Sequence, residues 1–223
     1  MKQALRFLRL DIVTVKPYLT WKNLAIVLGV PAFLMYFLDD AGLMVLFVLM
    51  SVGLMFVSYP FSVGEQNGID ALHATLSIQR KTAVLGRYLF TFSVDILVCL
   101  LTVAGMALAA AAKGVAPDRA AAGLLVCTGF AFFTLAQAVQ LPLYFRLGYA
   151  KAKVLSVLPF LMVPVLVLGY GALGERTRGF FAGVGAWVAA NTALSIVAAA
   201  VLWLAAMFVS YDISCAGYRK REF

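Results

Sequence analysis

The chain has 223 residues, of which 64% are hydrophobic and only 13% charged, with a formal net charge of +8. Soluble domains average about 45–50% apolar and about 25% charged residues, so this composition excludes an ordinary soluble fold and indicates a membrane protein. The apolar runs are long and continuous rather than alternating, which favours helices over a transmembrane barrel.

The first 20 residues predict an amphipathic helix that lies in the membrane interface. Apolar side chains recur at helical spacing on one side, and basic side chains cluster on the adjoining side. The apolar set is Leu5, Leu8, Ile12, Val15 and Leu19, and the basic set is Lys2, Arg6, Arg9 and Lys16. Pro17 ends or restarts this helix, because proline fits only the first turn of a helix. The alternative is that these residues simply anchor the first membrane span.

Six windows are apolar and long enough to cross a bilayer, which requires roughly 20 residues. They are Trp21–Leu38, Leu43–Val63, Tyr88–Ala112, Ala120–Phe145, Val154–Leu173 and Phe180–Tyr211. The fold class is therefore all-α, a single polytopic membrane domain over residues 1–223. The sixth window is long enough to tilt or to project beyond the membrane.

Basic residues are distributed unequally between the two sides of this topology. Fourteen of the 18 Lys and Arg residues lie in the two termini, in the segment from Gly64 to Arg87, or in the loop from Arg146 to Lys153. The positive-inside rule therefore places both termini in the cytoplasm. The net charge indicates topology and contact with lipid headgroups rather than nucleic-acid binding.

The segment Gly64–Arg87 is the largest connection on the cytoplasmic side. It opens with turn-forming residues, GEQNG, and continues with apolar residues at helical spacing before Arg80-Lys81. A short amphipathic helix at the membrane surface is expected there.

Motifs for metal binding, disulfide formation or nucleotide binding are not found in the sequence. The cysteines, Cys99, Cys127 and Cys215, show no CxxC spacing, and His73 is the only histidine, so a metal site or disulfide is not predicted. The chain has no GxxxxGK[ST] phosphate loop. The chain is therefore not predicted to be an enzyme or to hold a cofactor.

Four polar residues inside the spans are candidates for a transport pathway. Asp95 is the strongest, because a carboxylate at mid-bilayer costs about 2.5–3.5 kcal/mol and should face protein or water. Either Asp95 lines a pathway for a cationic or amphipathic substrate, or it has an internal partner, such as Thr91 or a basic group at the cytoplasmic edge. Gln137, Gln140 and Asn191 are more typical of contacts between helices.

The segment between the second and third windows resembles a known family. An acidic, Asn-containing turn holds Glu65, Asn67, Gly68 and Asp70, and Leu72 follows it. Next come Leu76, Arg80-Lys81 and Arg87-Tyr88, the last pair opening the third span. This pattern is similar to the signature of type-2 ABC exporter permeases, in the short six-span branch that includes phenol-soluble-modulin and antimicrobial-peptide exporters. Ser77-Ile78-Gln79 lacks the proline that is usual there.

The resemblance implies a coupling helix at residues 64–87 that docks on a cytoplasmic ATPase. Its implied contact residues are Asp70, His73, Thr75, Gln79, Arg80 and Lys81. It also implies two ABC ATPase subunits that hold ATP and Mg, a second permease, identical or related, and a place in the bacterial plasma membrane. The implied activity is export of amphipathic peptides, toxins or hydrophobic compounds.

Two other functions stay open on the sequence alone. One is a self-contained secondary carrier in which Asp95 binds a proton or cation, although no convincing internal repeat is present. The other is a membrane scaffold or immunity protein that transports nothing.

Overall fold

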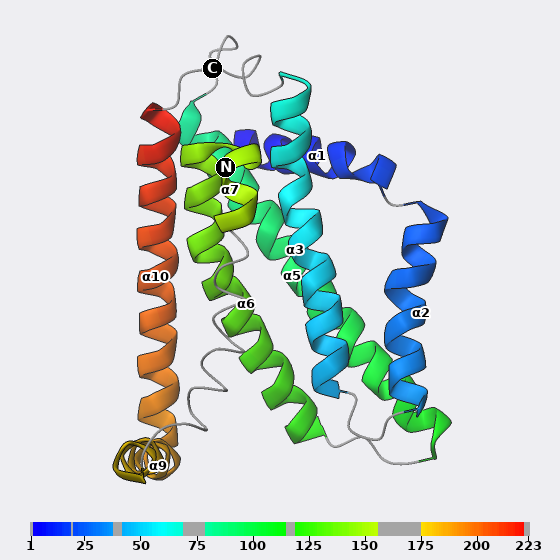
Figure 1. Ribbon diagram of the computed structural model, residues 1–223, viewed down its shortest axis with the longest axis vertical. Helices are drawn as coiled ribbons and strands as arrows, with labels where there is room; N and C mark the ends of the chain where they lie inside the picture. The colour runs from blue at the N-terminus through cyan, green and yellow to red at the C-terminus, as the bar shows by residue number, and fades with distance from the viewer. Residues whose placement is uncertain are drawn as a thin grey trace.

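The computed structural model describes residues 2–18, 20–37, 42–68, 79–114, 119–155 and 175–220 as a bundle of helices (Figure 1). No strand occurs in these ranges, so the all-α prediction is confirmed. The elements are α1 (Lys2–Val15), η1 (Lys16–Tyr18), α2 (Trp21–Phe37), α3 (Gly42–Gln66), α5 (Arg80–Ala112), α6 (Arg119–Leu147), α7 (Tyr149–Leu155), α9 (Glu175–Ala190) and α10 (Thr192–Lys220).

Four stretches within the described residues are long and apolar enough to cross a membrane. They are Val48–Gln66, Arg80–Ala112, Ala122–Leu147 and Thr192–Lys220. These stretches lie in α3, α5, α6 and α10, and they overlap the second, third, fourth and sixth predicted windows. The first window coincides with α2, which has 17 residues. The fifth window lies outside the described residues except for its first two, so a count of six spans stays a prediction.

The sixth window was predicted to be one helix and is two. The chain turns at Asn191, so that α9 is seen end-on in Figure 1 while α10 runs along the bundle. Polar side chains bind carbonyl oxygens at the turn: Asn191 Nδ2 donates to Trp187 O (3.0 Å), and Thr192 Oγ1 donates to Ala189 O (2.9 Å). Such local bonds compensate backbone groups where a helix changes direction.

The proposed coupling segment is shorter than 64–87, because the flanking helices take both of its ends. α3 ends at Gln66. Gly68, two residues later, has a φ of 64°, which suits glycine. α5 begins at Arg80, eight residues before the predicted start of the third span. Its N-cap Gln79 has an extended backbone, and Thr82 N donates to Gln79 O (2.8 Å).

α5 is the longest element, with 33 residues, or about 50 Å at 1.5 Å per residue. This exceeds the roughly 30 Å of a bilayer's hydrocarbon core, and a long span is accommodated by tilting. Figure 1 shows α5 running obliquely through the bundle. It packs against α1, α2, α3, α6 and α10, and so touches most of the other helices.

One end of the bundle carries α1 and α7, both lying across it (Figure 1). α3, α6 and α10 end there, and α2 and α5 begin there. Gly148, with a φ of 79°, makes the corner between α6 and α7. This end therefore gathers the termini and connections that the sequence assigned to the cytoplasmic side; its orientation in a cell stays a prediction.

A glycine of α10 allows close contact with α6. A Cβ atom added to Gly217 of α10 would lie 3.1 Å from Arg146 Cβ of α6 and 3.4 Å from its Cα. These atoms belong to the backbone or are attached directly to it, so they yield less readily than the end of a flexible side chain, and glycine suits this contact between α6 and α10.

We expect Gly217→Leu to lower the free energy of unfolding by about 1–3 kcal/mol, because the added side chain overpacks this contact. Unfolding in mixed micelles, followed by circular dichroism, measures the loss. Gly183→Leu in α9, where a Cβ meets nothing within 4 Å, is the matched control. Equal losses in the two variants would contradict the close packing.

Candidate functional site

Arg87 joins three helices near the end that carries α1. Its Nε lies 3.8 Å from Asp11 Oδ1 of α1, and both side chains are less than a tenth exposed. Its Nη2 donates to Pro60 O of α3 (3.3 Å), and its Cζ lies 4.2 Å from the centre of the Phe61 ring. A buried guanidinium is stable only when it is paired and hydrogen-bonded, and these contacts meet that need.

The ion pair also decides which face of α1 packs inward. Phe7, Asp11 and Val15 are buried at a spacing of four residues, whereas Ile12 is 47% exposed. From the sequence, Ile12 was predicted to lie on the apolar face of this helix, and no role was predicted for Asp11. The i, i+4, i+8 spacing of Phe7, Asp11 and Val15 places them on one face of a helix and could have indicated that Asp11 is buried. The buried carboxylate is explained only once Arg87 is known to lie beside it.

Glu65 connects the end of α3 to the start of α7. Its carboxylate accepts hydrogen bonds from the backbone N–H groups of Tyr149 (2.5 Å) and Ala150 (3.4 Å). A carboxylate at a helix N-terminus satisfies free N–H groups and complements the helix dipole. Glu65 belongs to the family-like pattern, and its bonds fix one border of the proposed coupling segment.

Arg80 fixes the other border by binding the last turn of α10. Its Nη1 donates to the carbonyl oxygens of Tyr218 (3.2 Å) and Arg219 (2.6 Å). Carbonyl groups at the C-terminus of a helix lack partners within the helix, and a cation there is favourable. Further along α5, the hydroxyl of Tyr88 lies 2.6 Å from Ser210 Oγ and 2.9 Å from Ser214 Oγ. The start of α5 is therefore bound to α10.

The predicted partner-contact residues fall into three groups. Asp70, His73 and Thr75 lie outside the described residues. Gln79 and Lys81 are exposed, as a contact surface requires. Arg80 is half-buried and turned toward α10, so it anchors the segment's border.

Asp95 and Gln137 form a polar pair between α5 and α6. Gln137 Nε2 donates to Asp95 Oδ1 (2.8 Å), and each residue is only 1% exposed. The internal partner of Asp95 is thus Gln137, not Thr91, whose hydroxyl donates to Arg87 O (2.9 Å). Asp95 Oδ2 and Gln137 Oε1 are buried without a hydrogen-bond partner.

The other two pathway candidates bind residues four positions away in the chain. Gln140 Nε2 donates to Tyr144 OH (3.2 Å) one turn along α6, and Asn191 binds Trp187 O at the α9–α10 corner. Of the four candidates, only Asp95 and Gln137 are brought together by these bonds. A pathway role for any of them stays a prediction.

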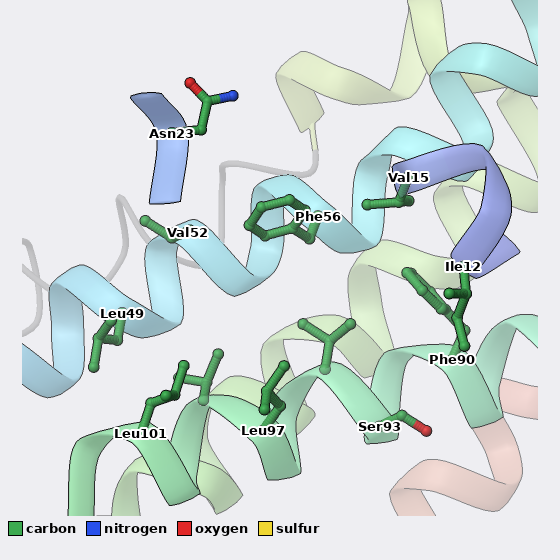
Figure 2. A pocket seen from close by; sticks show the side chains of 12 residues that line it. Ile12, Val15, Asn23, Leu49, Val52, Phe56, Phe90, Ser93, Leu97 and Leu101 are labelled. Carbon is green, nitrogen blue, oxygen red and sulfur yellow. The ribbon is translucent and has the colours of Figure 1, made fainter. Parts of the chain in front are cut away.

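An apolar groove of about 330 Å³ lies on a different side of α5 (Figure 2). Residues from α1, α2, α3 and α5 line it, and among them only Asn23 and Ser93 are polar. The full lining is Ile12, Val15, Asn23, Leu49, Val52, Phe56, Phe90, Ser93, Val94, Leu97, Val98 and Leu101. Asp95 is not among these residues, so the groove and the polar pair occupy separate faces of one helix. This groove was not predicted from the sequence.

Within the described residues, no three His, Cys, Asp or Glu side chains gather as metal ligands would.

A family model described as "ABC-2 family transporter protein" matches residues 7–219. The chain belongs to this family. It is thus a membrane component of an ABC transporter, and membership implies ABC ATPase partners in general. No curated protein and no solved structure gave a match.

Within this ABC-2 protein, we expect Arg87→Gln to lower the free energy of unfolding by about 3–5 kcal/mol, because it leaves a buried carboxylate without its cation. Unfolding in mixed micelles measures this loss. Lys81→Gln, which removes an exposed cation from the same helix, is the control and should change little.

A double-mutant cycle tests the pairing itself. Adding Asp11→Asn to Arg87→Gln should cost less than Asp11→Asn costs alone, since the partner is already gone. Additive losses would show that Asp11 and Arg87 act independently.

Proposed function

We propose that the chain is the permease subunit of an ATP-driven ABC exporter. Two cytoplasmic ATPase subunits would hold ATP and Mg and drive it, and a second permease, identical or related, would complete the pathway. The end of the bundle that carries α1 and α7 would face the cytoplasm of a bacterial cell. The observation that carries this proposal is that both borders of the segment between α3 and α5 are bonded to other helices.

These bonds give the segment a mechanical connection to the bundle. Glu65 binds the start of α7, and Arg80 binds the end of α10. Arg87, two turns into α5, pairs with α1 and binds α3. A force applied to residues 67–79 by an ATPase would therefore reach four helices besides α5. A segment that served only as a positively charged anchor would not need these contacts.

The apolar lining of the groove favours the proposal that the cargo is amphipathic or hydrophobic. Its apolar lining offers dispersion contacts and excludes charged groups, and Figure 2 shows it between α2, α3 and α5. Basic residues stand next to lining residues in the sequence: Lys16 follows Val15, and Lys22 precedes Asn23. An amphiphile could place its apolar part in the groove and its polar part near η1.

We expect Lys81→Glu to weaken co-purification of the cognate ABC ATPase by about tenfold, or ~1.4 kcal/mol, because Lys81 is exposed beside the coupling segment. Quantitative pull-down in detergent measures it. Lys113→Glu, an exposed lysine that follows the opposite end of α5, is the matched control and should bind normally.

Arg80→Gln tests separately whether the ATPase binds and whether its motion reaches the helices of the bundle. Because Arg80 binds α10, this variant should retain the ATPase and lose transport-linked stimulation of ATP hydrolysis. If the wild-type chain captures no ABC ATPase, the exporter proposal fails.

Filling the groove tests the cargo class. Leu97→Trp should abolish stimulation of ATP hydrolysis by an amphipathic cationic peptide, while basal hydrolysis by the reconstituted transporter stays the same. Leu100→Trp is the control, since Leu100 lies on the same helix, is 62% exposed and does not line the groove. Equal stimulation in both variants would exclude the groove from cargo binding.

A further inference from the structure

We propose that Asp95 is a proton-binding site: its carboxyl group carries a proton on Oδ2 at neutral pH and forms a doubly hydrogen-bonded acid–amide pair with Gln137. The proposal concerns the state of these two side chains and does not depend on the exporter function.

The described residues provide no counter-charge for Asp95. Among the residues that the structure describes, no Lys or Arg side chain forms an ion pair with Asp95. Arg87, two turns earlier on α5, is engaged with Asp11 and with Pro60 O. An ionised carboxylate buried in this way would have one neutral amide N–H as compensation, and isolated buried charges neutralise instead.

The hydrogen bonds that Asp95 and Gln137 make, and those they lack, also indicate a proton between the two side chains. Gln137 Nε2 donates to Asp95 Oδ1 at 2.8 Å, which joins one edge of the two planar groups. The remaining oxygens, Asp95 Oδ2 and Gln137 Oε1, are both buried acceptors without a donor. Two leftover acceptors would be an unusual cost for a buried pair. One proton on Oδ2 turns that atom into a donor for Gln137 Oε1, the acceptor that is left over on the amide.

Within the described residues, α5, α6 and the Gly42–Gly64 part of α3 contain no second acidic side chain that would compete for this proton. The thiol of Cys99 lies one turn further along α5, and Cys127 of α6 lies near Cys99. α3 from Gly42 to Gly64 contains no acidic or basic residue, and Tyr59 is its only ionisable side chain. The hydroxyl of Thr91 is occupied by Arg87 O.

The site has a direct consequence for the bundle. While α5 and α6 stay packed, the proton is held between two side chains that are each 1% exposed. If the two helices separate and water enters, the carboxyl group regains solvation and can release the proton. Proton occupancy would thus report whether the α5–α6 contact is closed.

Infrared difference spectroscopy on the full chain in lipid nanodiscs tests the proposal. At neutral pH, the wild type should show the carbonyl stretch of a protonated carboxylic acid, which shifts down in ²H₂O. Asp95→Asn should remove this band, while Asp11→Asn should leave it. Absence of the band in the wild type, or its survival in Asp95→Asn, would overturn the proposal.

A second variant keeps the test decisive if Asp95→Asn does not fold. Gln137→Leu should move the band to higher frequency, because the acid loses both hydrogen bonds. Gln140→Leu, three residues along the same helix and bonded to Tyr144, should leave the band in place. An unchanged band in Gln137→Leu would contradict the acid–amide pair.

A metal cation between the same oxygens is the competing occupant. A bound sodium ion would raise the melting midpoint in sodium chloride above that in choline chloride for the wild type but not for Asp95→Asn. We expect equal midpoints in the two salts, and a sodium-dependent midpoint would overturn the assignment of a proton.

Discussion

The buried ion pair between Arg87 and Asp11 is the constraint on which the rest of the arrangement depends. An arginine placed among apolar side chains needs a carboxylate and carbonyl oxygens within reach, and it obtains them from α1 and α3. This requirement turns Phe7, Asp11 and Val15 of α1 inward and holds α1 across the end of the bundle. The rings of Phe61 and Phe145 lie 4.2 and 6.0 Å from Arg87 Cζ, so aromatic side chains shield the guanidinium from water.

α5 makes different contacts on different faces along its length. Its start binds the last turn of α10 through Arg80, its second turn binds α1 and α3 through Arg87, and its middle binds α6 through Asp95. Leu97 and Leu101 face the apolar groove in Figure 2. The polar contacts join α5 to other helices and do not line the groove, so the two sets of contacts can be altered independently by mutation.

Hydropathy predicted the helical class, the approximate positions of α2, α3, α5 and α6 and the clustering of basic residues at one end, because these properties follow from local composition. The contacts of the candidate site could not be predicted in the same way. Asp11 and Arg87 are 76 positions apart, and Asp95 and Gln137 are separated by 42, so each pair exists only after the helices pack. The turn at Asn191 was missed for a different reason: an apolar run on both sides hides a change of direction. The groove was missed because its lining comes from four elements.

The uninterrupted length of α5 has a geometric consequence. Arg80 lies seven residues before Arg87, and Ala112 lies 25 residues after it, which correspond to about 10 Å and about 37 Å along the axis. If α5 pivots as a rigid rod at the place where Arg87 is clamped, a sideways shift of about 1 Å at Arg80 becomes a shift of about 3–4 Å at the far end. A modest movement at one membrane surface would then open or close space at the opposite surface, with no bending of the helix.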